Sequence, residues 1–218
     1  MCFSATASFV AGVSLSAIGV LTLKKATRKT DMPFALIPLL FGIQQIIEGM
    51  LWLSFRYDFA LLNATTTYVF SVFSHTLWPI FVPFSVGLLE PVRWRRNVMR
   101  LFQAIGLIIG LYLLYFIVKY PVVAVAEEHI VYVSPHFYEL PAMLLYLLAT
   151  CVVSFFSSHR VVRWFGALAL LLFIVAYWFY TAALFSVWCF FSAILSAMIV
   201  MYFCSGTQSR IGVGLLRY

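Results

Sequence analysis

The residues most able to do chemistry lie on one face of the segment 41–52, which is otherwise apolar. Gln44, Gln45, Glu48 and Trp52 follow one another at spacings of one, three and four positions. At about 100° per residue in an α-helix, these side chains fall within an arc of about 100°. A carboxylate between apolar turns normally faces the interior of a protein, so this face is the first half of a predicted site.

A second polar face follows in the segment 66–78, where Ser71, His75 and Trp78 again share one side of a helix. A short loop is expected to join the end of the first helix to the start of the second. At about 1.5 Å per residue, Glu48 lies about 12 Å before that loop and His75 a similar distance after it. Helices joined by a short loop are usually neighbours. We therefore predict that Glu48 contacts His75.

This pair of residues fits more than one kind of chemistry. As catalytic residues, Glu48 would be a metal ligand or general base and His75 a ligand or proton acceptor. Cys2, Glu48 and His75 are of types that bind zinc, which is the predicted cofactor. The alternatives are a purely structural pair that fixes helix packing and a polar floor that binds a substrate. The predicted pocket around them consists of Gln44, Gln45, Trp52, Ser71 and Trp78. Other residues on the expected outer side could complete it, namely Cys2, Ser4, His136, Glu139, Tyr177, Tyr180, Thr181 and Cys189.

The composition requires a lipid environment for these elements. Hydrophobic residues make up 64% of the 218 residues and charged residues 10%, which is too apolar for a water-soluble globule of this size. Apolar runs of roughly 20 residues recur along the chain, and each is long enough to cross about 30 Å of hydrocarbon as a helix. Helices are expected because a lipid-exposed backbone must satisfy its own hydrogen bonds.

The fold class predicted from these runs is all-α, a bundle of seven transmembrane helices. The expected spans are 5–23, 32–55, 66–89, 98–118, 137–157, 163–182 and 184–204, which together form one membrane domain over 1–204. Residues 205–218 form the predicted cytoplasmic tail. The longest connection, 119–136, contains two alternating apolar segments that would pair as a short hairpin or lie on the membrane surface.

The orientation follows from the basic residues. All 14 Lys and Arg residues except Arg56 and Lys119 fall in loops or ends on one side of this arrangement. The positive-inside rule places that side in the cytoplasm, so the N terminus is expected outside and the C terminus inside. The net charge of +7 is thereby explained by topology, and no nucleic acid is expected as a partner.

Three stretches carry a resemblance to a known family. The opening Met-Cys-Phe-Ser-Ala-Thr-Ala-Ser-Phe, the run Phe41-Gly-Ile-Gln-Gln-Ile-Ile-Glu-Gly and the run His75-Thr-Leu-Trp-Pro resemble a family of uncharacterised bacterial multi-pass membrane proteins. The resemblance covers mainly residues 1–96. It implies the inner membrane of a bacterium and supplies no activity.

The sequence therefore predicts a multi-pass membrane protein with a polar pocket open to the outside. The first hypothesis is a zinc-dependent membrane enzyme or a binding protein, with a small molecule or a lipid as its ligand. The second is a proton-coupled transporter or channel for small molecules, and the third is a membrane sensor or assembly subunit. The residues do not decide whether the protein is an enzyme, and they leave its oligomeric state open.

Overall fold

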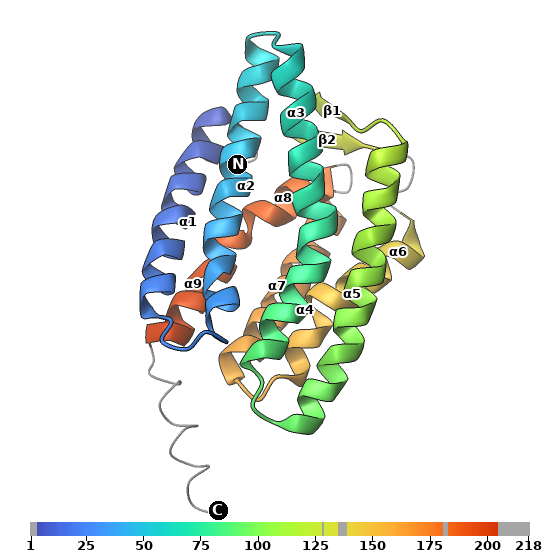
Figure 1. Ribbon diagram of the computed structural model, residues 1–218. Helices are drawn as coiled ribbons and strands as arrows, with labels where there is room; N and C mark the ends of the chain where they lie inside the picture. Colours follow the sequence, from blue (N-terminus) through green and yellow to red (C-terminus); the bar gives the residue numbers. More distant parts are fainter. Residues whose placement is uncertain (1–3, 128, 135–138, 181–182, 205–218) are drawn as a thin grey trace, which may run out of the picture.

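The computed structural model describes residues 4–127, 129–134, 139–180 and 183–204, and these form an elongated helical bundle (Figure 1). Its helices are α1 (Ala5–Lys25), α2 (Met32–Arg56), α3 (Ala60–Ser71), α4 (Trp78–Leu89), α5 (Arg93–Lys119), α6 (Leu140–Thr150), α7 (Arg160–Phe179), α8 (Leu184–Phe190) and α9 (Ser192–Cys204). A π-helix, η1 (Val72–Leu77), joins α3 to α4, and a 3₁₀-helix, η2 (Val152–Phe156), follows α6. The predicted helical class is confirmed.

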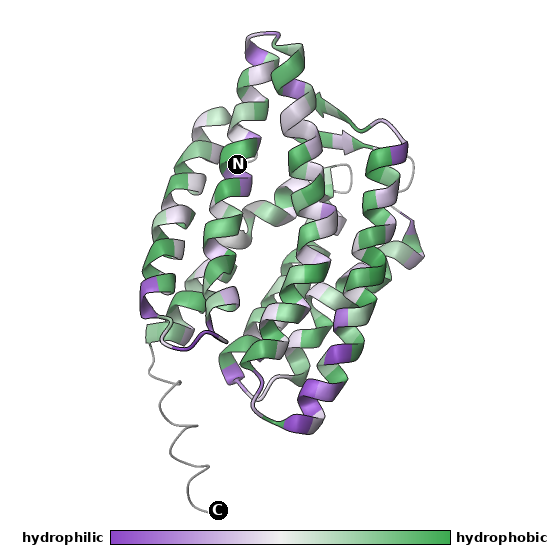
Figure 2. Cartoon of the chain, viewed as in Figure 1, coloured by the Kyte–Doolittle hydropathy of each residue, from purple (hydrophilic) through white to green (hydrophobic). Residues whose placement is uncertain are grey.

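Five continuous helical segments are long and apolar enough to cross a membrane: Ala5–Lys25, Met32–Arg56, Ala60–Leu89, Arg93–Lys119 and Arg160–Phe179. Two shorter apolar segments, Leu140–Phe156 and Leu195–Cys204, lie among them. Hydrophilic residues gather at the ends of the long helices, as the hydropathy colouring shows (Figure 2). The outer faces of the helices carry exposed apolar side chains such as Val13, Ile108 and Leu171, as expected for contact with lipid.

Glycines set the close packing of α1 on α2. A Cβ atom on Gly12 would lie 2.7 Å from Ile46 Cγ1, and one on Gly42 would lie 2.7 Å from the backbone nitrogen of Ser16. Both distances are far below ordinary van der Waals contact, so the two helices approach backbone to backbone. This packing holds α2 in place, and α2 carries the first polar face.

The segment between α5 and α6 contains a two-stranded antiparallel sheet. Strand β1 (Val123–Ala126) pairs with β2 (Ile130–Val133), with Ala124 opposite Tyr132. Tyr132 is fully buried and its ring stacks on Phe70 of α3, with the ring centroids 4.4 Å apart. Of the two conformations expected for 119–136, the hairpin is therefore confirmed, and it packs beside α3 at one end of the bundle (Figure 1).

The last predicted span, 184–204, is divided into two helices. α8 ends at Phe190 and α9 begins at Ser192, and α8 runs across the bundle at an angle to the long helices (Figure 1). Within α8, Ser186 and Cys189 are buried and both hydrogen-bond to side chains of α2. The break thus allows a short helix to meet the polar face of α2.

Candidate functional site

Glu48 is the centre of a buried polar cluster. Its side chain is fully buried within the bundle. Gln45 Nε2 donates a hydrogen bond to Glu48 Oε2 over 3.2 Å, and the hydroxyl of Ser186 donates a very short one to Glu48 Oε1. A buried carboxyl group is costly unless donors face it, and these two donors come from α2 itself and from α8.

Gln44 fixes the register of the helices around Glu48. Its Oε1 accepts from Trp78 Nε1 at 2.8 Å, and its Nε2 donates to Cys189 Sγ at 3.0 Å. Glu48 lies one turn beyond Gln44 along α2. Because the segment η1–α4 runs antiparallel to α2, His75 lies one turn from Trp78 in the same direction. The Gln44 contacts therefore set Glu48 and His75 at a similar level of the bundle.

His75 lies in the π-helix and is fully buried. Its Nδ1 is 2.7 Å from Ser74 Oγ and 3.2 Å from the carbonyl oxygen of Ser71. The hydroxyl of Ser74 also reaches the carbonyl oxygen of Phe70 at 3.0 Å, so it donates there and accepts from the ring. Nδ1 then carries the proton, and Nε2 is the acceptor nitrogen of the neutral imidazole.

The π-helix arises from a proline that follows it and from a hydrogen-bond donor on another helix. Pro79 follows directly after Trp78 and has no backbone N–H to donate to the turn before it. The hydroxyl of the buried Tyr146 in α6 donates to the carbonyl oxygen of Ser74 at 2.5 Å instead. Single π-turns inside helices occur often at functional sites, and this one presents His75 to the interior.

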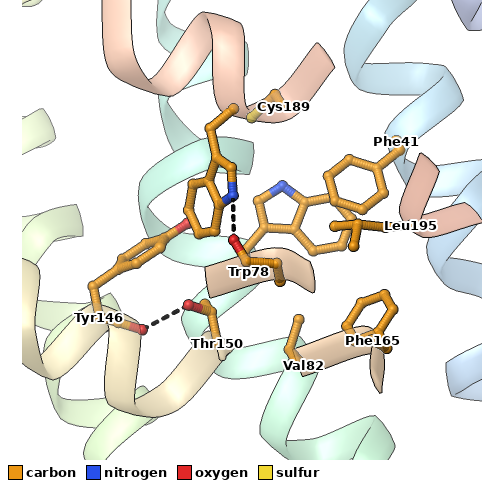
Figure 3. A pocket seen from close by; sticks show the side chains of 10 residues that line it. Phe41, Trp78, Val82, Tyr146, Thr150, Phe165, Cys189 and Leu195 are labelled. Carbon is orange, nitrogen blue, oxygen red and sulfur yellow. Dashed lines mark hydrogen bonds between the residues drawn. The ribbon is translucent and has the colours of Figure 1, made fainter. Parts of the chain in front are cut away.

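A small cavity is lined by Trp78 and Cys189, the two residues that hydrogen-bond to Gln44 (Figure 3). Its volume is about 30 Å³. Phe41 and Trp78 form one side, with ring centroids 3.9 Å apart. Its walls are mostly aromatic and aliphatic and come from α2, α4, α6, α7, α8 and α9; they consist of Phe41, Trp78, Val82, Tyr146, Thr150, Phe165, Ala169, Trp188, Cys189 and Leu195.

Several buried polar atoms have no hydrogen-bond partner within the described part of the chain, and three of them belong to α2 and α3. They are Gln45 Oε1, Trp52 Nε1 and Thr67 Oγ1. Gln45 and Thr67 are buried as whole residues, whereas Trp52 is half-buried. Because Gln45 Nε2 donates to Glu48, its carbonyl oxygen points away from that carboxyl group and presents an acceptor to the interior.

The structure places the predicted residues as follows. Gln44, Gln45, Glu48 and Trp78 belong to one hydrogen-bonded region through the contacts above, and Cys189 joins it. Ser71 is buried and its hydroxyl donates to the carbonyl oxygen of Thr67 within its own helix. The direct contact between Glu48 and His75 stays a prediction.

Two members of the cluster were missed in the sequence, Ser186 and Tyr146. Each stands as a polar residue in an apolar run, which is a common pattern in helices and carries no signal of its own. No charged residue lies three or four positions from either of them, so the sequence gives no charged helix face that would indicate a site.

The zinc hypothesis receives no support from the geometry. Across residues 4–127, 129–134, 139–180 and 183–204 there is no group of three His, Cys, Asp or Glu side chains that could hold a metal ion. Glu48 and His75 lie in this part, but Cys2, the third predicted ligand, lies outside the described residues. Zinc therefore stays a prediction that rests on residue types alone.

A second buried polar cluster, also missed in the sequence, closes the opposite end of the bundle. The Glu90 carboxylate accepts from the backbone N–H of Val92 at 3.1 Å, from that of Ser158 at 2.7 Å and from the Ser158 hydroxyl. His159 Nε2 lies 3.1 Å from the carbonyl oxygen of Leu89, and its Nδ1 lies 3.4 Å from the hydroxyl of Tyr202. These bonds tie the α4–α5 loop to the start of α7 and to α9.

An ion pair lies at the same end of the bundle. Arg28 meets Asp31 in a two-pronged contact with both distances 3.0 Å. Hydrogen bonding to the buried Asp31 raises the pKa of the Arg28 guanidinium above its usual value. This pair fixes the loop between α1 and α2.

Comparisons with known proteins give a family and no activity. Neither the curated proteins nor the solved structures gave a match to the chain. A family model described as "Family of unknown function (DUF6629)" matches residues 1–213, which agrees with the expected resemblance to an uncharacterised family. Because this match spans nearly the whole sequence, the chain belongs to the DUF6629 family.

Proposed function

We propose that this protein is an integral membrane protein that binds a small molecule at the Glu48 cluster. In this proposal the chain crosses the inner membrane of a bacterium seven times, with the N terminus outside. Two further crossings would be formed by α6 with η2, which is the segment Leu140–Phe156, and by α8 with α9, which contains the segment Leu195–Cys204. The concentration of Lys and Arg at the end opposite the hairpin supports this orientation.

The observation that carries the binding proposal is the carbonyl oxygen of Gln45. It is buried, and no donor in the described part of the chain reaches it. A buried acceptor without a donor costs about 1–3 kcal/mol, so native proteins rarely keep one without a reason. A ligand with an N–H or O–H group would supply the missing donor.

The neighbouring groups indicate what kind of ligand fits. Gln45 Oε1 and the Glu48 carboxyl group are both acceptors, and His75 Nε2 is an acceptor in the neutral ring. Each described Lys and Arg is exposed or only partly buried, so none of them is buried beside these acceptors. An ammonium group, with three donors and a positive charge, matches this arrangement best. If the bound molecule reacts, Glu48 and His75 are the groups placed to move its proton.

The proposal is tested by native mass spectrometry of the protein purified in mild detergent. Wild type should carry a bound small molecule. Gln45→Leu removes the acceptor and should raise the dissociation constant about tenfold, which corresponds to about 1.4 kcal/mol, so a smaller fraction of the variant should carry the molecule. The matched control is Gln103→Leu, because Gln103 lies on α5 and donates to the carbonyl oxygen of Pro83, outside the cluster.

Three results would contradict the proposal. One is a wild-type protein that carries no small molecule. Another is equal retention of the molecule by wild type and Gln45→Leu. The third is loss of the molecule in Gln103→Leu as well, because general destabilisation would then explain the lower binding of Gln45→Leu without a specific role for Gln45.

A further inference from the structure

The cavity and the Glu48 cluster share their walls. Trp78 and Cys189 both line the cavity, and both hydrogen-bond to Gln44, which lies one turn from Glu48. In α8, Ser186 donates to Glu48 while Cys189, one turn further, faces the cavity. A molecule held at Glu48 would therefore have the cavity directly beside it.

The cavity is poorly suited to water. The polar groups of its lining are already engaged as donors: Thr150 Oγ1 donates to the carbonyl oxygen of Tyr146 at 2.8 Å, and Trp188 Nε1 to that of Ala169 at 3.2 Å (Figure 3). The Trp78 and Tyr146 donors are used by Gln44 and Ser74. A buried water needs two to four polar partners, whereas an apolar group needs none.

We infer that the cavity holds the apolar part of the ligand, so that the ligand is a small amphiphilic amine. This inference rests on the proposed function, because it takes the polar end of the ligand to bind at Gln45 and Glu48. The aromatic and aliphatic lining then contacts a short alkyl group. A cavity needs about 10–15 Å³ to hold one water molecule. A cavity of about 30 Å³ therefore accommodates a short alkyl chain and no large ring system.

The length of the alkyl group should then control affinity. Burial of one CH₂ group contributes about 0.8 kcal/mol, which is roughly a fourfold gain in affinity. n-Butylamine has three more CH₂ groups than methylamine, so full burial predicts a gain of roughly 50-fold. A gain of at least tenfold is expected where burial is partial.

The experiment compares the two amines by thermal unfolding of the purified protein in detergent. The measured quantity is the amine concentration that raises the unfolding midpoint by a fixed amount, because equal stabilisation by two ligands requires the same ratio of concentration to Kd. In wild type this concentration should be at least tenfold lower for n-butylamine than for methylamine. Ala169→Leu, which fills the cavity, should abolish the advantage of n-butylamine and leave the methylamine value unchanged.

Two further variants make the comparison specific. Ala167→Leu makes the same change on α7 at a partly exposed position outside the cavity lining, and it should behave as wild type. Val82→Leu is the second cavity-filling change and serves if Ala169→Leu does not fold. It should reduce the advantage of n-butylamine in the same direction.

The outcomes separate this inference from the proposed function. If methylamine and n-butylamine act equally on wild type, or if the n-butylamine advantage persists in both cavity-filling variants, the inference is wrong. The proposed function survives in that case if Gln45→Leu weakens the effect of both amines. If neither amine stabilises wild type, the inference and the amine assignment both fail, while a molecule lost in Gln45→Leu would still support binding at the cluster.

Discussion

At the scale of single residues, two buried carboxyl groups are held in different ways. Glu90 accepts hydrogen bonds from two backbone N–H groups and one hydroxyl, so all its close partners are donors of the protein itself. Glu48 has donors in Gln45 and Ser186, and it lies beside the Gln45 oxygen that no described donor reaches. The first arrangement is complete and structural, and the second has room for a ligand.

This difference predicts the effect of Glu90→Gln on stability. The amide keeps the size of the side chain but loses one acceptor oxygen that faces a donor. We expect the free energy of unfolding to fall by about 1–3 kcal/mol. Thermal unfolding in detergent measures this loss, with the exposed Glu127→Gln as the matched control, for which a change within about 0.5 kcal/mol is expected. An unchanged midpoint for Glu90→Gln would show that the second cluster does not hold the loops together.

The residues of the candidate site were only partly predictable. Gln44, Gln45, Glu48 and His75 stand out because strongly polar side chains in apolar runs are rare. Ser186 does not stand out, because single hydroxyl residues are common in such helices. Its bond to Glu48 depends on the angle at which α8 crosses α2, and that angle is set by packing that no local pattern encodes.

At the scale of elements, composition predicted helices well and their interruptions poorly. The lengths of the apolar runs account for the long helices, since each must cover about 30 Å. The π-helix at Val72–Leu77 arises because Pro79 cannot donate and Tyr146 supplies the donor from another helix. The division of 184–204 into α8 and α9 likewise follows from contacts with α2. Both depend on tertiary partners, which periodicity does not report.

The ends of the elements predict the orientation of the chain. The first turns of α5 and α7 carry arginines, although the positive end of the helix dipole lies there and disfavours positive charge. Their position is explained by the orientation of the chain, which keeps basic residues on the cytoplasmic side. We expect Glu127→Cys in the hairpin to react with a membrane-impermeant maleimide in intact cells, and Asn97→Cys at the start of α5 to react only after permeabilisation. Both variants are made in a chain whose four native cysteines are replaced by alanine. The reverse pattern would overturn the proposed orientation.

At the scale of the whole molecule, the two polar clusters lie toward opposite ends of an otherwise apolar bundle. The Glu90 cluster joins α4, α7 and α9 at the end rich in basic residues. The Glu48 cluster lies on the side of the hairpin, between α2, η1, α6 and α8. The cavity separates them, with the buried side chains of Val82, Phe165 and Leu195 at its walls.

The central claim is that Gln45 and Glu48 form a binding site, and an experimental density map of the protein in lipid nanodiscs tests it most directly. We expect density from a non-protein group within about 2.7–3.2 Å of Gln45 Oε1, next to the Glu48 carboxyl group. A map in which a donor of the protein itself occupies Gln45 Oε1, with no other density beside Glu48, would contradict it.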